Sequence, residues 1–174
     1  AAHRLYRLAM EKQKPDAERE PGYQERDLRR LRQSMQAISR RFDETVDKAT
    51  LSYLLSRYAE LPEQYRSQAT DSFFGISSHI DQGQVDQVIE DSYALTSLSD
   101  EATRLAWLDS SVEEFEASDD PLIRYAVLSY AERMALELES KELRGQFQRW
   151  RPEYMEAVIA YNRSLGQPIY ADAN

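Results

Sequence analysis

The sequence predicts an all-α fold, an irregular bundle of about six to eight helices with two long helices near the C-terminus. The 174 residues include only 5 Gly and 6 Pro, too few for a turn-dense β-sandwich or barrel. In most segments, apolar residues recur at intervals of three and four positions, as they do on one face of a helix. With 41% hydrophobic and 30% charged residues, the chain is long enough and apolar enough to bury a core.

Three helices are expected at the start of the chain. The first contains Leu5 and Leu8 and ends before Pro15, because proline disfavours helical geometry in the residue before it. The second follows Pro21-Gly22 and has a buried stripe made of Leu28, Leu31, Met35, Ile38 and Phe42. The third is capped by Asp43 and closed by Leu61-Pro62. Its periodic residues are Val46, Ala49, Thr50, Tyr53, Leu54 and Tyr58.

The remaining elements are predicted from caps and periodicity. We expect a helix over residues 63–74, a loop over 75–83, helices over 84–95 and from Ser99 as N-cap, and a turn around Val112 and Phe115. Asp120 with Pro121 is a strong start for a long helix that continues through Arg149. Pro152 should kink or restart it, and the last helix, Tyr154 to Leu165, should stop at Gly166. We expect residues 1–174 to form a single helical subdomain, with 166–174 as an extended exit.

Charge is divided unevenly along the chain. Residues 1–41 hold 11 Lys and Arg against 6 Asp and Glu, whereas residues 42–174 hold 11 against 25. A basic segment can bind nucleic acid, but the net charge of −9 makes the chain as a whole repel phosphate, and helical pairs such as Glu25 with Arg29 offer internal partners. We therefore expect no nucleic-acid partner. No stretch approaches the roughly 20 apolar residues of a membrane span, so none is expected.

Nucleophilic catalysis has few candidate residues here. Cysteine is absent, and the only histidines are His3 and His79. His79 follows Ser77 and Ser78 and precedes Asp81, a spacing too short for a catalytic triad, whose members a rigid scaffold brings together from distant positions. No Gly-x-Ser-x-Gly nucleophile motif occurs. We interpret His79 as a polar loop residue and assign no catalytic residue.

No metal or cofactor is predicted either. The sequence lacks His-Glu-x-x-His, calcium-loop and phosphate-binding glycine motifs. One acidic run could attract a cation, although such runs are more often solvated helix faces and caps. It consists of Glu113, Glu114, Glu116, Asp119 and Asp120.

The 11 tyrosines raise the question of an aromatic-lined peptide groove. Most of them occur at helical core spacing. Tyrosine can bury its ring while its hydroxyl stays near water, so packing at the edge of the core is the expected role. The residues considered for a groove are Tyr53, Tyr58, Tyr125 and Tyr130.

Two stretches carry a family resemblance. The first runs from Lys14-Pro15-Asp16 through Arg19-Glu20-Pro21-Gly22-Tyr23 to Arg26-Asp27, and the second from Gly166 to Asn174. They resemble the Lys-Pro-Asp, Arg-Glu-x-Gly-Tyr and Arg-Asp pattern and the Tyr-Pro-Asp-Ala-Asn motif of the bacterial dipeptidyl-peptidases 7 and 11, serine-peptidase family 46. Ala171 stands where the family usually has proline. Because both motifs occur in the family's order, the resemblance spans nearly the whole chain.

The resemblance implies a fragment of a larger enzyme. Family members are serine-type dipeptidyl peptidases, in which a chymotrypsin-like double β-barrel carries the Ser, His and Asp. An inserted helical domain caps the active-site cleft, helps to exclude internal peptide segments, and so makes the enzyme release N-terminal dipeptides. The enzymes are cofactor-free homodimers in the periplasm or on the surface of Gram-negative bacteria. None of the family's catalytic or substrate-binding positions maps onto a motif here, so the fragment alone should be inactive, with residues 166–174 leading toward the catalytic domain.

Two other functions fit the residues. A free-standing helical interaction module could dock an acidic partner through the basic first helices. A cryptic hydrolase using His79 would turn over dipeptide reporter substrates as the isolated chain. The resemblance favours the cap domain over both. The residues that determine the preference at the cleaved position are expected to lie outside this chain.

Overall fold

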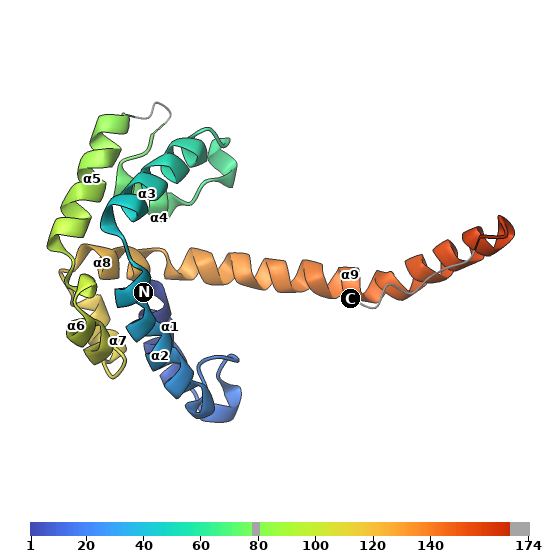
Figure 1. Cartoon of the computed structure of the whole chain (residues 1–174), viewed down its shortest axis with the longest axis horizontal. Coiled ribbons are helices and arrows are strands. Elements are labelled where there is room, and N and C mark those ends of the chain that lie inside the picture. Colours follow the sequence, from blue (N-terminus) through green and yellow to red (C-terminus); the bar gives the residue numbers. More distant parts are fainter. Residues whose placement is uncertain (78–80, 168–174) are drawn as a thin grey trace. The chain divides into compact units, whose positions relative to one another are not determined.

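The computed structural model describes residues 1–77 and 81–167. These residues contain nine α-helices, three short 3-10 helices and no strand (Figure 1). The all-α prediction is therefore confirmed. The chain forms two compact units, Ala1–Glu132 and Arg133–Asn174.

The first unit begins with four α-helices, α1 (Ala2–Lys12), α2 (Glu25–Arg41), α3 (Glu44–Ala59) and α4 (Gln68–Phe74). Asp43 caps α3, as predicted, by accepting a backbone N–H three residues on at 3.0 Å. The single helix predicted over residues 63–74 is wrong. A 3-10 turn at Glu63–Tyr65 is separated from α4 because Arg66 and Ser67 adopt extended backbone, and the Ser67 hydroxyl caps α4.

Four further α-helices follow, α5 (Gln82–Leu95), α6 (Glu101–Ala106), α7 (Val112–Glu116) and α8 (Pro121–Leu128). Asp100, rather than the predicted Ser99, caps α6, because Ser99 belongs to a 3-10 turn that ends there. Asp120 caps α8 with Pro121 at the first helical position, as predicted. The sequence therefore predicts the positions of these helix N-caps to within one residue.

The long helix predicted from Pro121 through Arg149 is interrupted. α8 ends at Leu128, and the Ser129 hydroxyl donates to the Tyr125 carbonyl at 2.7 Å. Such a local bond competes with regular helical bonding. A new helix, α9 (Tyr130–Ser164), begins at the next residue.

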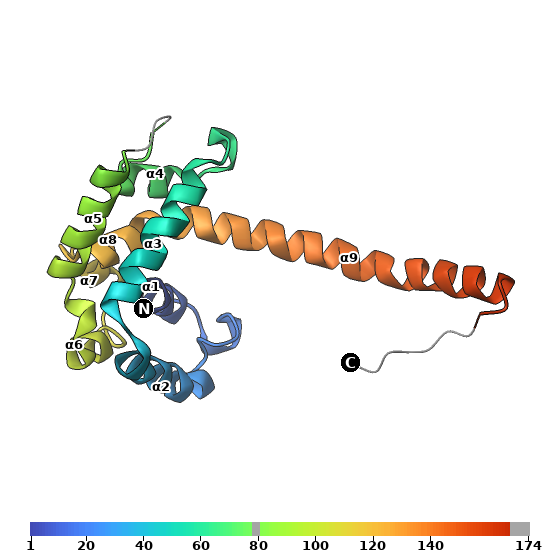
Figure 2. The ribbon, with the colours of Figure 1, turned by 45° about the horizontal axis from the view of Figure 1, so that its top comes forward.

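Two apolar cores stabilise the first unit. The larger is formed by α1, α2, α7, α8 and the residues around α6, and in it the Phe115 ring lies 5.5 Å from that of Tyr6 and 4.5 Å from that of Trp107, between centroids. The smaller core lies where α3 and α5 run side by side and α4 joins them (Figures 1 and 2). The larger core thus joins the first two helices to helices much later in the sequence, whereas the smaller core is built from α3, α4 and α5.

The predicted buried faces are partly correct. In α2, Leu31 and Met35 are buried, whereas Phe42 at the end of the stripe is 40% exposed. In α3, the predicted Val46, Tyr53 and Leu54 are exposed, and the buried residue is Leu55. The packing partner α5 decides which face of α3 turns inward, and the sequence of α3 alone does not contain that information.

Arg104 of α6 is a buried cation that joins α2 to the segment before α6. Its side chain is 1% exposed and donates to the carbonyls of Met35 at 3.0 Å, Leu98 at 2.6 Å and Ser99 at 3.2 Å. Nε and Nη1 make these bonds, and the third guanidinium nitrogen, Nη2, donates to the Ser39 hydroxyl. A buried guanidinium is tolerated only when its donors are satisfied in this way. Figure 2 shows α6 beside α2.

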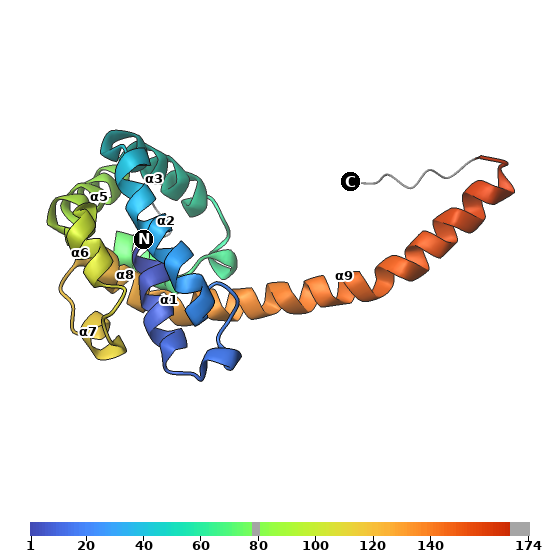
Figure 3. The same ribbon diagram turned by 60° about the horizontal axis from the view of Figure 1, so that its bottom comes forward.

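In its described part, the second unit consists of α9 from Arg133 onward and its C-terminal turn. Pro152 lies inside α9, so the predicted restart at Tyr154 is wrong. Figure 3 shows the ribbon of α9 bending along its length, as expected of a helix in which a proline removes one backbone donor. Gly166 adopts φ +65°, and Gln167 donates its N–H to the Asn162 carbonyl at 3.0 Å. This is the glycine stop that was predicted.

Candidate functional site

The Lys14–Asp27 motif forms the connection between α1 and α2, and a buried carboxylate holds it. Glu11 of α1 is 2% exposed and accepts from the Lys14 ammonium at 2.9 Å and from the backbone N–H of Glu20 at 3.0 Å. Burial alone would raise the pKa of Glu11. The hydrogen bonds from Glu20 and Lys14 outweigh burial and lower this pKa below its ordinary value. Glu11 is therefore an ionised anchor for the loop.

Asp16 in the same motif caps α2 from outside the helix. Its carboxylate accepts the backbone N–H of Glu25, the first residue of α2, at 2.7 Å. Arg19 bridges Asp16 at 3.3 Å and the Glu25 carboxylate at 3.0 Å. Gln24 occupies the N-cap position without a side-chain cap bond. The motif's charged side chains thus serve the start of α2.

The turn of the motif depends on glycine and an aromatic ring. Gly22 adopts φ +97°, where other residues are strained, and its N–H donates to the Asp27 carboxylate at 2.9 Å. The Arg7 guanidinium lies 5.1 Å from the centre of the Tyr23 ring. These contacts show that the motif residues hold the connection between α1 and α2 in place. From the sequence, only their resemblance to a family was noted, and none of these contacts was predicted.

The acidic run has the same character. Ser111 and Glu114 form a capping box at α7, Glu116 accepts from the Tyr6 hydroxyl at 3.2 Å, and Asp120 accepts from α8 and from Thr96. Burial and Glu116 raise the pKa of Tyr6 to about 12, so the phenol stays a donor at neutral pH. Within the described residues, no cluster of three or more His, Cys, Asp or Glu is placed to hold a metal ion. Glu114 and Asp120 confirm the cap interpretation of the run.

Of the two candidate histidines, His3 lies in the described part of the chain. His3 lies in α1, with its ring centre 6.0 Å from that of Tyr130. His79 and Ser78 lie outside the described residues. Asp81, their sequence neighbour, caps α5 by accepting the Gln84 N–H at 3.2 Å. Within the described residues, Asp81 therefore has a helix-capping contact.

The tyrosines considered for a groove are divided among separate environments. Tyr58 and Tyr125 pack on the smaller core and Tyr130 on the larger, which confirms the core-edge prediction for these three. Tyr53 is 64% exposed, so the same prediction is wrong for it. Burial raises the pKa of Tyr58 to about 12, and its hydroxyl donates to the Ser67 carbonyl at 3.1 Å. Tyrosine therefore serves the packing of helices here.

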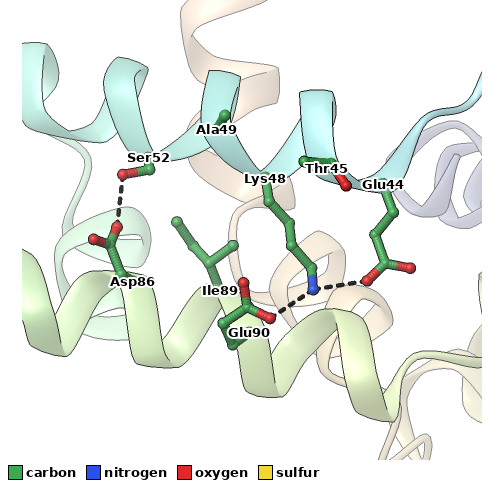
Figure 4. Close-up of a pocket in the computed structure, with 8 residues that line it drawn as sticks. All are labelled: Glu44, Thr45, Lys48, Ala49, Ser52, Asp86, Ile89 and Glu90. Carbon is green, nitrogen blue, oxygen red and sulfur yellow. Dashed lines mark hydrogen bonds and ion pairs between the residues drawn. The ribbon is translucent and has the colours of Figure 1, made fainter.

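A polar pocket of about 400 Å³ lies between α3 and α5 (Figure 4). The Lys48 ammonium pairs with Glu44 of its own helix at 2.7 Å and reaches across to Glu90 of α5 at 2.6 Å, and Ser52 donates to Asp86 at 2.6 Å. Hydrogen bonds to Glu44 and Glu90 raise the pKa of Lys48. A lysine base that activates a serine must be neutral, so this ammonium does not suit that role. This pocket was not predicted from the sequence: the Glu44 and Lys48 spacing of four indicates an ion pair within α3, but not the contact of Lys48 with Glu90 on α5.

Residues 166–174 were predicted as an extended exit. Gly166 and Gln167 form the helix stop described above, and residues 168–174 lie outside the described part of the chain. No helix in the described ranges is at once long enough and apolar enough to cross a membrane.

The fold and these contacts define a helical module whose polar motifs stabilise its own loops and helix ends. The comparisons then identify its family. Residues 1–174 match the family Peptidase S46 over their whole length, and the chain belongs to that family. It is 42% identical, over all 174 residues, to an Asp/Glu-specific dipeptidyl-peptidase of Shewanella putrefaciens. The chain spans only 23% of that relative's length. The resemblance drawn from the two motifs is confirmed.

Proposed function

We propose that residues 1–174 are part of a helical cap in a serine-type dipeptidyl peptidase, where they restrict access to an active site elsewhere in the polypeptide. The observation that carries this proposal is that the residues of the family motif hold the loop between α1 and α2 in place. Glu11, Asp16 and Asp27 bind the loop and the start of α2, so the motif maintains a rigid helical body. Membership of a peptidase family supports the reaction, and the 23% coverage of the relative leaves length for a catalytic part.

The cap acts by steric selection. A body with two packed cores beside a cleft leaves room for the free end of a peptide and excludes a continuing chain, so cleavage is limited to an N-terminal dipeptide. Serine, histidine and aspartate on a double β-barrel supply nucleophile, base and orienting group in this proposal. We extend it to a homodimer in the periplasm or on the cell surface of a Gram-negative bacterium, without a cofactor.

The name of the relative supports a preference for acidic residues. That protein is an Asp/Glu-specific dipeptidyl-peptidase, and we propose the same preference for the whole protein to which this chain belongs. Reporter dipeptides ending in Asp or in Leu before the leaving group measure it directly. Faster release from the Asp reporter supports the proposal, and equal or faster release from the Leu reporter contradicts it.

The cap function is tested in the full-length peptidase. The readout is the ratio of dipeptide release from peptides with a free N-terminus to cleavage of N-acetylated peptides. We compare the wild type with Phe115→Ala, which loosens the larger core, and with Leu95→Ala, which alters an exposed leucine as a matched control. Phe115→Ala should lower the ratio and Leu95→Ala should leave it unchanged. A deletion of residues 1–174 that folds and keeps the full ratio would overturn the cap function.

The isolated chain tests the rival hydrolase. Purified residues 1–174 should release no dipeptide from the reporters. Release that disappears in His79→Ala would establish a hydrolase within this chain and contradict the proposal. Release that persists in His79→Ala would trace to a contaminating peptidase, which repurification of both chains removes.

A further inference from the structure

One face of α9 is apolar and largely aromatic along its length. Its members recur at spacings of three, four and seven, which places them on one side of a helix. They are Leu136, Leu143, Phe147, Trp150, Tyr154, Val158 and Tyr161, with Leu165 directly after the last helical residue, and are called here the aromatic stripe. Phe147 is 68% exposed and Tyr154 67%, and α9 has no buried residue. Solvent-exposed apolar area of this extent indicates a surface that binds another element.

Charged side chains border the stripe on both sides. Helical geometry places Arg144 and Arg151 along one edge and Glu139 and Glu153 along the other, all of them exposed. A shallow hollow on the arginine side includes Leu143 and Phe147 in its lining. The stripe therefore has one basic and one acidic edge, in the positions that set partner choice in paired helices.

A second copy of α9 fits this pattern poorly. In an antiparallel pair with two-fold symmetry each edge meets its own copy, which would bring Arg144 and Arg151 against the same arginines. In a parallel pair in register, Phe147, Trp150 and Tyr154 would each meet their own copy in one layer. Two-stranded parallel pairs prefer aliphatic residues in those layers. Both arrangements favour a different helix as the partner.

The length of the relative supplies a source for that helix, since this chain spans 23% of it. We propose that the aromatic stripe is covered by an amphipathic helix from the part of the polypeptide outside residues 1–174. This helix places acidic side chains beside Arg144 and Arg151 and basic ones beside Glu139 and Glu153. The inference rests on the proposed function only in taking the chain as part of a longer peptidase.

Cysteine labelling tests the proposal in the full-length protein and in residues 1–174. Phe147→Cys reports on the stripe, and Glu156→Cys on the opposite face of the same helix is the matched control. Alkylation is measured by mass spectrometry of the peptides that contain each position. In the full-length protein, Cys at 147 should react at least about tenfold more slowly than Cys at 156, because reaction requires local opening. In the isolated chain, the two rates should be similar.

Each other outcome overturns the proposal. Equal rates in the full-length protein would leave the stripe uncovered. Protection at 147 in the isolated chain that grows with protein concentration would identify a second copy as the occupant. Protection there that is independent of concentration would identify residues 1–132 as the occupant.

A charge reversal tests the edges without disturbing the apolar residues. Arg144→Glu combined with Arg151→Glu should lower the thermal midpoint of the full-length protein and leave that of the isolated chain unchanged. Arg149→Glu, which lies away from the stripe, is the single-charge control and should change neither. An unchanged midpoint of the full-length double variant would overturn the charge-matched helix.

Failure of the proposed function can be told apart from failure of this inference. Dipeptidyl activity of the wild-type full-length protein is assayed separately from labelling. Protection at position 147 in a protein without that activity would keep the inference and reject the function. Activity in a protein with an unprotected position 147 would keep the proposed function and reject the inference.

Discussion

The first unit, residues 1–132, and the part of α9 beyond it have similarly spaced apolar residues, but only the first unit buries them. In the first unit, side chains such as Phe115 and Ile123 are at most 1% exposed, packed among helices from distant parts of the chain. In α9, residues with equally regular spacing contact one another, as the rings of Phe147 and Trp150 do at 6.3 Å between centroids, but none of them is buried. Periodicity therefore identifies a face that can be buried, while the presence of a partner decides whether it is.

The largest difference between the two regions is expected for a residue of the larger core. Phe115→Ala should lower the free energy of unfolding of the isolated chain by about 3–5 kcal/mol, because the surrounding side chains cannot fill the space of the ring. Urea unfolding followed by circular dichroism measures it. A loss below about 1 kcal/mol would show that this core does not hold the unit together.

A smaller effect is expected at the loop anchor, where Glu11→Gln should cost about 1–3 kcal/mol at neutral pH. The folded-state pKa of Glu11 is lowered, so its stabilisation is complete above the ordinary carboxyl range and is lost as the pH falls through the folded pKa. The difference in unfolding free energy between wild type and variant should therefore shrink on acidification. A difference that stays constant from neutral to strongly acidic pH would show that the carboxylate charge contributes nothing.

The smallest effect is expected on α9. Phe147→Ala in the isolated chain should change the free energy of unfolding by no more than about 0.5 kcal/mol, because the ring is mostly exposed. The same urea titration serves for both phenylalanines. A loss above about 2 kcal/mol would mean that the stripe is already covered within the isolated chain, and the contrast between the two regions would fail.

Much of the fold could be predicted because its signals are local. Asp43, Asp120 and Gly166 act on backbone groups within a few residues of themselves, and each was placed correctly from the sequence. The break at Ser129 was missed, because a serine inside a run of strong helix formers gives no clear stop signal. Pro152 was expected to kink or restart the helix, and α9 continues through it as one helix.

The rest depends on residues far apart in sequence. Arg104 binds a carbonyl 69 positions away, and Glu132 accepts the backbone N–H of Ala69, 63 positions away. Neither residue stood out, since an arginine and a glutamate on helices are ordinarily solvated. The motif around Asp16 was noticed only through its resemblance to a family, and its capping role became clear from contacts that no spacing rule describes.

The position of Asp16 ties the order of a helix to the integrity of a surface segment. Because the cap of α2 is supplied nine positions before Glu25, hydrolysis of any peptide bond between the two would free the aspartate from the helix end it holds. The first turn of α2 would then fray together with the cleaved connecting segment. Resistance of this segment to added proteases is therefore a direct gauge of how firmly the start of α2 is wound.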